Sequence, residues 1–373
     1  MIKKIVKSCR ARYHSRADTL FVNRVLAAAV LFSFISTWIS GCSPAAEQAN
    51  NSVLPDPIVL VWEYTGIDTE LNSIGPMEPV NVVSPTWFHL DDSDGNIRSS
   101  FDQDYLDWAR ERDYLVWALV TNSFDPELTA SFLSNRQSRN YFIDSLVELA
   151  LVYELDGINI DFENFHSDYR DSFTIFIREL SKRCSEANLT LSVDVTMISG
   201  SEYWSLNYDR ASLAKEADYI VLMAYDEHWQ SSPVAGSVAS LPWVEEGLKR
   251  VLQEVPAEQL ILGIPFYTRL FEIDQSGTAP QVLNSWSYSM HRAEEIISNH
   301  DAEVFWDEAS GQHVARYEKN GLTYKMWLED AVSIQQRLEL AQKYNLAGVA
   351  AWRRGLEKPE IWAVMEANIS ANP

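Results

Sequence analysis

The chain has 373 residues, enough for one large domain or two smaller ones. It is 46% hydrophobic and 22% charged, a balance that is typical of globular proteins and excludes a disordered or fibrous chain. Its formal net charge of −23 at pH 7 excludes nucleic acid as a partner, because the phosphate backbone would be repelled.

The N-terminal region has the pattern of a secretion signal. Residues 1–24 contain seven Lys and Arg against one acidic residue, and an apolar run from Val25 to Ile39 follows. This run is shorter than the roughly 20 residues of a transmembrane helix. It ends at Ile39-Ser40-Gly41-Cys42, which resembles a bacterial lipobox.

We therefore expect residues 1–41 to be removed as a lipoprotein signal peptide and Cys42 to be lipidated. Residues 42–55 would then tether a single domain, residues 56–373, to a membrane of the cell envelope. The protein would face the periplasm or the exterior, and Ser43 is compatible with the outer membrane where the host has one. The remaining chain would carry 23 basic and 52 acidic residues, so the attached lipid, and not electrostatic attraction, would hold the protein at the membrane. An uncleaved signal anchor is the alternative.

From residue 57 onward, β-branched and aromatic runs alternate with amphipathic stretches, which predicts βα units around a parallel sheet. Eight strands are expected: Ile58–Tyr64, Val80–Leu90, Tyr114–Thr121, Gly157–Glu163, Leu189–Thr196, Tyr219–Tyr225, Leu260–Tyr267 and Leu346–Trp352. Six helices are expected: Asp102–Arg112, Ser138–Tyr153, Asp168–Glu186, Ser212–Glu216, Leu241–Glu254 and Asp330–Tyr344. The predicted fold class is α/β, a (β/α)8 TIM barrel, rather than a doubly wound open sheet.

One connection is too long for a simple loop. About 60 residues separate the seventh strand from the helix near Asp330, where two to six are usual. Three further strands are predicted there: Glu303–Asp307, Gln312–Glu318 and Leu322–Trp327. We expect a small α+β insertion at about residues 268–327, above the C-terminal face of the barrel, with a hairpin turn at Asn320-Gly321. Four of its rings either line a groove or pack against one another: Trp306, Tyr317, Tyr324 and Trp327.

The fourth strand contains the candidate catalytic residues. Its polar and apolar residues alternate, so that Asn159, Asp161 and Glu163 would point into the barrel. Two carboxyl groups buried side by side are costly unless they share a proton. Glu163 also falls at the C-terminal end of its strand, where barrel enzymes place catalytic groups. The pattern predicts a carboxyl group with a raised pKa that acts as a general acid.

Three motifs on three strands carry a family resemblance. The segment from Asp156 to Glu163 resembles the D-x-x-D-x-D-x-E signature of glycoside hydrolase family 18. Met223-Ala224-Tyr225-Asp226, which ends the sixth strand, is similar to that family's M-x-Y-D motif, and Trp352 matches the Trp that floors its cleavage subsite. The residues after Asp226 resemble the branch that contains spore-cortex and peptidoglycan hydrolases.

The resemblance implies a retaining hydrolysis in which the substrate's own 2-acetamido oxygen attacks the anomeric carbon. It implies that Glu163 protonates the leaving oxygen and later deprotonates water, and that Asp161 accepts the acetamido N–H. Tyr225 would donate a hydrogen bond to the acetamido oxygen. The sugar would bind against Trp352, and the same pocket would include Met223 and Asp226.

The sequence departs from the family signature at Asn159, where an aspartate is usual. An amide can hydrogen-bond Asp161 but cannot take up its charge. We therefore expect Asp161 to stay ionised more readily and the pH optimum to shift.

Other chemistry has little support. The six histidines after residue 41 form no zinc signature, no G-x-S-x-G elbow occurs, and Cys184 has the spacing of a core residue.

We expect a monomeric enzyme without cofactor or metal that cleaves β-1,4 bonds after N-acetylglucosamine in peptidoglycan or its fragments. A chitinase, a catalytically inactive sugar-binding module and a scaffolding lipoprotein are the alternatives, the last being the weakest because it leaves the inward carboxyls unexplained.

Overall fold

The computed structural model describes residues 57–64, 71 and 74–369. The predicted signal peptide, the lipidation site at Cys42 and the tether at 42–55 lie outside the described residues. Within the described part of the chain, no helix combines the length and apolarity needed to cross a membrane.

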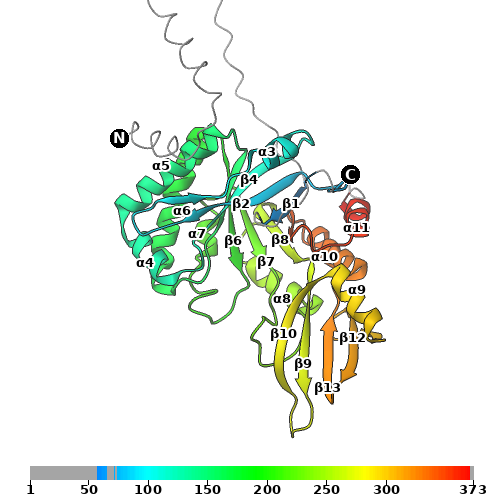
Figure 1. Cartoon of the computed structure of the whole chain (residues 1–373). Coiled ribbons are helices and arrows are strands. Elements are labelled where there is room, and N and C mark those ends of the chain that lie inside the picture. The colour runs from blue at the N-terminus through cyan, green and yellow to red at the C-terminus, as the bar shows by residue number, and fades with distance from the viewer. Residues whose placement is uncertain (1–56, 65–70, 72–73, 370–373) are drawn as a thin grey trace, which may run out of the picture. The chain divides into compact units, whose positions relative to one another are not determined.

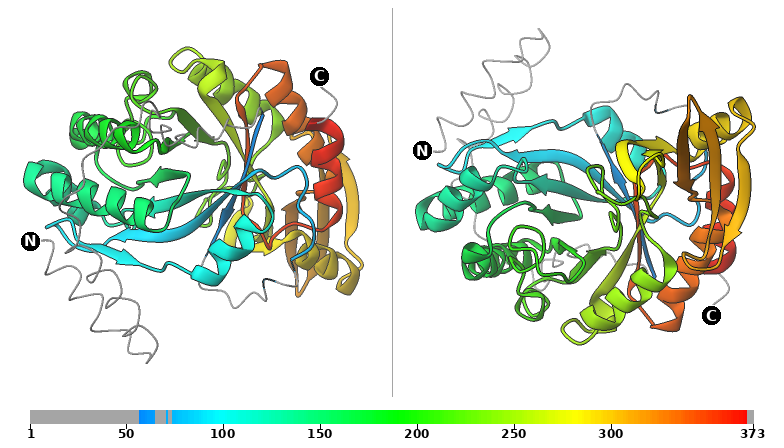
Figure 2. Two further views of the ribbon diagram at one scale, coloured as in Figure 1. Left: turned by 90° about the horizontal axis from the view of Figure 1, so that it is seen from above. Right: turned by 90° about the horizontal axis from the view of Figure 1, so that it is seen from below.

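Eight parallel strands close into a barrel (Figures 1 and 2), which confirms the predicted fold. In chain order they are β1 (Ile58–Glu63), β2 (Val82–Leu90), β4 (Leu115–Thr121), β5 (Gly157–Asp161), β6 (Thr190–Thr196), β7 (Tyr219–Met223), β8 (Leu260–Pro265) and β14 (Gly348–Trp352). Each strand pairs with the next, and β14 pairs with β1 to complete the circle. A short antiparallel strand, β3 (Ile97–Ser99), lies on β2 outside the ring.

Helices surround the barrel. They are α3 (Gln103–Arg110), α4 (Pro126–Ser134), α5 (Arg136–Val152), α6 (Arg170–Ala187), α7 (Arg210–Leu213), α8 (Leu241–Val251), α10 (Ala331–Lys343) and α11 (Glu360–Ile369). The six predicted helices are present, whereas α4 and α11 were not predicted. Asn135 explains why α4 is separate from α5: its extended backbone ends α4, and its side chain accepts from Gln137 N to cap α5.

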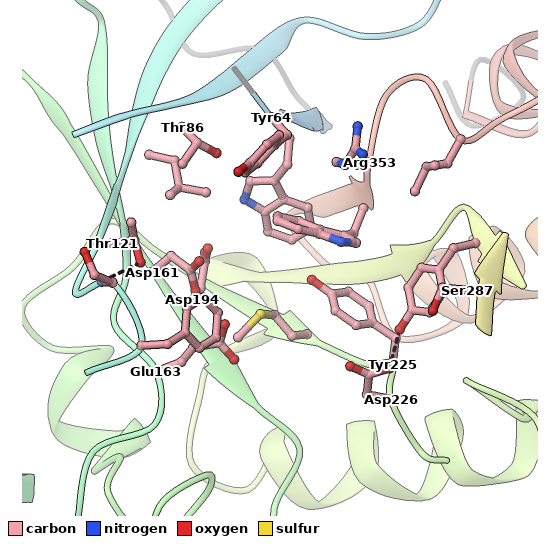
Figure 3. Close-up of a pocket in the computed structure, with 18 of the residues that line it drawn as sticks. Tyr64, Thr86, Thr121, Asp161, Glu163, Asp194, Tyr225, Asp226, Ser287 and Arg353 are labelled. Carbon is pink, nitrogen blue, oxygen red and sulfur yellow. Dashed lines mark hydrogen bonds between the residues drawn. The ribbon is translucent and has the colours of Figure 1, made fainter. Parts of the chain in front are cut away.

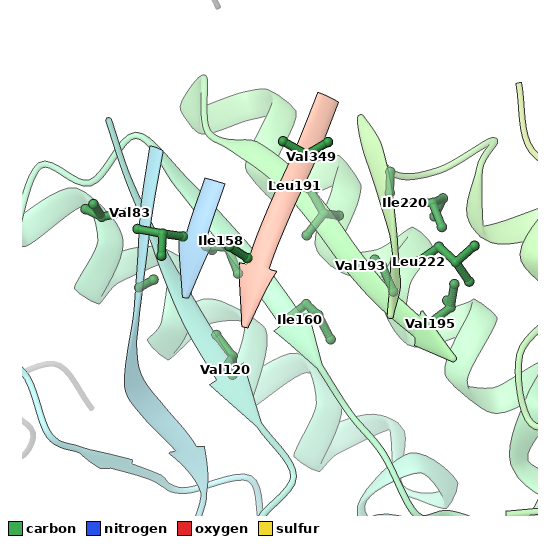
Figure 4. Close-up of a cluster of buried hydrophobic side chains, with 14 of the residues drawn as sticks. Val83, Val120, Ile158, Ile160, Leu191, Val193, Val195, Ile220, Leu222 and Val349 are labelled. Carbon is green, nitrogen blue, oxygen red and sulfur yellow. The ribbon is translucent and has the colours of Figure 1, made fainter. Parts of the chain in front are cut away.

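The core lies between the strands and the helices (Figure 4). Ile158 and Ile160 point outward from β5 and are fully buried, as the alternating pattern predicts. Burial of each such side chain contributes about 1.5–3 kcal/mol. Cys184 on α6 is also buried, and burial, assisted by the nearby Asp218 carboxylate, raises the pKa of its thiol to about 12.

The long connection after β8 folds as a five-stranded antiparallel sheet with one helix (Figure 1). Its elements are β9 (Tyr267–Asp274), β10 (Gln281–Ser289), α9 (Met290–Asn299), β11 (Glu303–Asp307), β12 (Gln312–Lys319) and β13 (Leu322–Trp327). The three predicted strands and the hairpin turn are present, and both Asn320 and Gly321 have positive φ. The structure adds β9, β10 and α9, and the sheet begins at Tyr267 because β9 continues directly from β8.

The four aromatic rings singled out in the insertion pack within it. Tyr317 stacks on Tyr324 with ring centroids 4.8 Å apart, and the ring of Trp306 packs edge-on against that of His313 at 5.1 Å. Trp327 packs on Phe271. These rings therefore build the small sheet rather than a groove.

A buried ion pair lies where the insertion rejoins the barrel. The carboxylate of Glu329 accepts hydrogen bonds from Arg337 at 2.7 and 3.0 Å, from Gln312 Nε2 at 3.0 Å and from Ser333 Oγ at 2.8 Å. Burial raises the pKa of Glu329 to about 7, although Arg337 acts in the opposite direction. This carboxylate is thus surrounded by donors, two of which, Ser333 and Arg337, lie on α10.

Candidate active site

A pocket of about 750 Å³ opens at the C-terminal ends of the barrel strands. Among the residues proposed from the sequence, its lining includes Asp161, Glu163, Met223, Tyr225, Asp226 and Trp352. Asn159 lies below them, fully buried in the barrel. Figure 3 shows Asp161, Glu163 and Asp194 together on one side of the pocket, with Tyr225 and Asp226 across from them. Three separate strand ends therefore meet at one site.

Asn159 is the centre of a buried hydrogen-bond network. Its Oδ1 accepts from Trp62 Nε1 at 2.9 Å and from Ser84 Oγ at 3.1 Å. Its Nδ2 donates to Ser192 Oγ at 3.0 Å and to Asp194 Oδ1 at 2.7 Å. Both N–H groups of the amide thus donate to residues of strand β6 and neither donates to Asp161, contrary to the expectation that Asn159 hydrogen-bonds Asp161.

Asp161 and Glu163 form a carboxyl pair joined by a side-chain hydrogen bond. Burial raises the pKa of Asp161 to about 7. Burial also raises the pKa of Glu163 well above its usual value, and the negative charges of Asp161, Asp194 and Asp226 add to that effect. Such a pair retains a proton near neutral pH, which is the state that a general acid requires.

Asp194, on β6, is a third carboxyl in the site that the sequence analysis missed. It lines the pocket and is only 1% exposed. Burial and the nearby Asp161 raise its pKa well above the usual value for aspartate. The site therefore contains three inward carboxyls, as many as the family signature places on one strand, but the third, Asp194, comes from the neighbouring strand.

Two buried side chains fix the backbone that carries Glu163. Asn122 Nδ2 donates to Glu163 O at 2.6 Å, and its Oδ1 accepts from Glu163 N at 3.1 Å. Tyr208 donates its hydroxyl hydrogen to Phe162 O at 2.8 Å. Asn122 directly follows β4, and its two hydrogen bonds hold the backbone of Glu163 in place.

Aromatic side chains form the wall opposite the carboxyls. The ring of Trp62 meets that of Trp352 at 5.7 Å and that of Tyr225 at 6.5 Å, both edge to face. Burial, followed by the charges of Glu163 and Asp194, raises the pKa of Tyr225 well above its usual value. Its hydroxyl therefore remains a hydrogen-bond donor at all pH values near neutrality.

The insertion contributes directly to the pocket through β9. Asp226 Oδ1 accepts hydrogen bonds from Tyr267 OH at 2.5 Å and from Arg269 Nη2 at 2.8 Å. Asp226 has a positive φ of 60°, so its carboxyl is held at a tight turn directly after β7. Sequence reasoning missed Tyr267 and Arg269 because it ended the seventh strand at Tyr267.

Further basic side chains lie along the pocket away from the carboxyls. Arg98 is exposed, and the guanidinium of Arg353 lies 5.6 Å from the ring of Tyr64. Burial, and then the charge of Arg98, lowers the pKa of His89 to about 4, so this histidine is neutral at pH 7. Arg98 Nε also lies 3.7 Å from Asp91 Oδ1 in an exposed ion pair.

Comparison with known proteins identifies the family. The model for glycosyl hydrolases family 18 matches residues 98–357. An uncharacterised glycosylase of Bacillus subtilis, YvbX, is 27% identical over 311 residues, which cover 80% of this chain and 88% of that protein. Cortical fragment-lytic enzymes of Bacillus anthracis, Bacillus cereus and Bacillus subtilis are 22%, 22% and 24% identical, and the chain spans 62%, 59% and 58% of their lengths.

Solved structures show the same fold. The spore cortex-lytic enzyme SleL of Bacillus megaterium superimposes with a TM-score of 0.73 at 20% identity, over 84% of this chain and 74% of that one. A chitinase from Chromobacterium violaceum superimposes with a TM-score of 0.75 at 22% identity, over 85% of this chain and 100% of that one.

Proposed function

The chain belongs to glycosyl hydrolase family 18 and is a glycoside hydrolase, and we propose that it cleaves β-1,4 bonds after N-acetylglucosamine in peptidoglycan or its fragments. The observation that carries the proposal is the hydrogen-bonded pair of Asp161 and Glu163 in a pocket walled by Tyr225 and Trp352. The family acts on N-acetylglucosamine-containing glycans, and the pocket offers partners for the acetamido group, the glycosidic oxygen and the apolar face of that sugar.

Glu163 acts first as the acid. Its raised pKa keeps a proton available for the glycosidic oxygen as the bond to the anomeric carbon breaks. It then accepts a proton from the water that opens the intermediate, which returns the carboxyl to its starting state. Asn122 supports both steps because its two hydrogen bonds fix the backbone of Glu163.

The substrate supplies the nucleophile, its own acetamido oxygen. Asp161 accepts the acetamido N–H and stabilises the positive charge that develops on that group. Tyr225 donates to the acetamido oxygen and fixes its line of attack. The apolar face of the sugar packs on Trp352, and Met223 fills the adjacent wall.

Charge along the pocket favours peptidoglycan over chitin. The lactyl group on every second sugar of peptidoglycan bears either a peptide with free carboxylates or, where the peptide is absent, a carboxylate of its own, whereas chitin carries none. Arg98 and Arg353 line the same pocket and can pair with such groups. The cortical fragment-lytic relatives support the same substrate.

A lipid anchor at Cys42 would place the enzyme at the cell envelope, next to this polymer. Globomycin-sensitive processing and a palmitate label on the chain that disappears in Cys42→Ala would support the anchor. A label that persists in the variant would refute lipidation at this residue.

The function is tested with the full chain, purified peptidoglycan and chitin hexamer, with products read by mass spectrometry. New reducing-end N-acetylglucosamine from peptidoglycan, absent with Glu163→Gln, would support the proposal. Cleavage of chitin hexamer alone would make the protein a chitinase. Retention of both polymers without cleavage would make it a sugar-binding module.

The arginines provide a sharper test of substrate choice. Arg98→Ala and Arg353→Ala are each expected to raise KM for peptidoglycan by up to about fivefold and leave KM for chitin hexamer unchanged, because an exposed ion pair contributes up to about 1 kcal/mol. Equal effects on both substrates would contradict recognition of carboxylates.

A further inference from the structure

Two buried oxygens in the active site have no hydrogen-bond partner. They are Oδ1 of Asp161 and Oδ2 of Asp194. Buried polar atoms are nearly always paired, so two orphans in one site require an explanation. The other oxygen of Asp194, Oδ1, already accepts from Asn159.

Strand register makes the two residues neighbours. Asn159 pairs with Ser192 and Ile160 with Val193, so the next step along β5 and β6 sets Asp161 beside Asp194. Paired parallel strands lie about 4.8 Å apart, and both side chains point into the barrel. Figure 3 shows the two carboxyl groups on the same side of the pocket.

The surroundings disfavour two charges here. The titratable partners of Asp194 are the carboxyls of Asp161 and Glu163 and the phenols of Tyr208 and Tyr225, all of which are neutral or negative. The other hydrogen-bonding neighbours of Asp194 are Asn159 and Trp62, which carry no charge. A single proton between the two orphan oxygens would pair both atoms and remove the repulsion.

We propose that Asp194 is a positioning residue for the hydrolysis: it stays protonated and donates its hydrogen to Asp161, which allows Asp161 to carry the negative charge that the acetamido group requires. The inference rests on the proposed reaction and deepens it. In this proposal Asp194 on β6 replaces the aspartate that the family signature places on β5, where this chain has Asn159.

The three carboxyls then hold two protons. In the resting site one proton lies between Asp161 and Glu163, and the other lies on Asp194. Substrate binding leaves the first proton on Glu163 and the negative charge on Asp161. Glu163 gives that proton to the leaving oxygen and takes one back from water, while Asp194 keeps its own throughout.

The test compares three variants of the full chain by kcat and KM across pH, with peptidoglycan and chitin hexamer as substrates. In Asp194→Ala we expect kcat to fall by about tenfold or more with KM unchanged, and the acidic limb of the pH profile to move up by about one unit. Asp194→Asn should stay within about threefold of the parent, because its amide N–H can also donate to Asp161.

The decisive variant moves the carboxyl from position 194 to position 159. Asn159→Asp combined with Asp194→Ala restores a proton donor beside Asp161 and should recover most of the kcat lost in Asp194→Ala. A double variant no better than the single one would overturn the proposal, as would Asp194→Ala with the parent's kcat and acidic limb. Glu329→Gln is the matched control, because it removes a buried carboxyl outside the pocket and should leave the pH profile unchanged.

A second measurement is independent of turnover. In the full chain labelled with 13C at aspartate side chains, the resonance that disappears in Asp194→Asn should be that of a neutral carboxyl at about pH 6, where an ordinary aspartate is ionised. An ionised resonance would overturn the proposal even in an active enzyme. If the parent cleaves neither substrate, the proposed reaction fails, and this titration still decides the protonation of Asp194.

Discussion

Two regions of the molecule bury carboxyl groups and treat them in opposite ways. At the base of the insertion, Glu329 is surrounded by donors from Arg337, Gln312 and Ser333. At the top of the barrel, Asp161 and Asp194 each leave one buried oxygen without a partner. Burial raises the pKa of Asp161 and Glu329 to about the same value, near 7. The pKa therefore does not distinguish the two regions, whereas the hydrogen-bond partners do.

The difference separates a structural carboxyl from one available for chemistry. The guanidinium of Arg337 neutralises the charge of Glu329, and the surrounding donors fix its geometry, so this carboxylate is not available to bind or protonate a substrate. The carboxyls of the barrel repel one another, and Asp161 and Asp194 each keep one buried oxygen without a donor, a cost that stability alone does not explain. Replacing residues in each region tests this distinction.

The largest effect is expected for Glu163→Gln. Loss of the proposed general acid should lower kcat by about 10²- to 10⁴-fold, since that is the usual contribution of such a group. The thermal midpoint should stay the same or rise, because one of the crowded carboxyls has been neutralised. A fall in both activity and midpoint would indicate that Glu163 has a structural role like that of Glu329.

The reverse pattern is expected for Arg337→Met. Removal of the guanidinium leaves the Glu329 carboxyl buried without its cation, which should lower the free energy of unfolding by about 3–5 kcal/mol. The kcat per folded molecule should be unchanged. Urea unfolding gives the first quantity and active-site titration the second. An unchanged stability would show that the pair is dispensable.

Stability should also depend on pH. The folded chain holds the proton of Asp161 up to about pH 7, whereas the unfolded chain releases it near pH 4. The folded state therefore binds more protons in this window, and the free energy of unfolding should fall as pH rises from about 4 to about 7. Asp161→Asn should flatten part of this slope in chemical unfolding, and a slope unchanged by the substitution would contradict the raised pKa.

The smallest effect is expected for Ser192→Ala, which removes one neutral acceptor from the network of Asn159. The free energy of unfolding should fall by about 1 kcal/mol, the usual value for a buried neutral hydrogen bond. A loss several times larger would mean that Asn159 depends on this contact to hold Asp194, and the comparison between the two regions would need to include it.

Local patterns in the sequence predicted the barrel and much of the site. The period-two alternation of β5 correctly turned Asn159 and Asp161 inward, because side-chain direction in a strand depends on neighbouring residues only. Glu163 and Tyr225 reached the same pocket because parallel barrel strands end at one face.

The missed residues depend on contacts between distant parts of the chain. Asp194 lies in an equally clear alternation, Ser192-Val193-Asp194, but its role appears only when β6 is placed in register with β5. Tyr267 and Arg269 reach Asp226 because β9 extends from β8 into the insertion, which no local pattern in the sequence indicated. Strand β10 was missed because its residues are largely exposed and polar.

The buried thiol of Cys184 gives the domain an internal reporter of its own opening. Among the described residues it is the free cysteine, and both its burial and its raised pKa suppress the thiolate that alkylating reagents attack. Modification must therefore wait until α6 detaches or the barrel opens. The rate of labelling, followed by mass spectrometry, measures how often this opening occurs. A slower rate in the presence of bound glycan would measure how much an occupied pocket stabilises the barrel around Cys184.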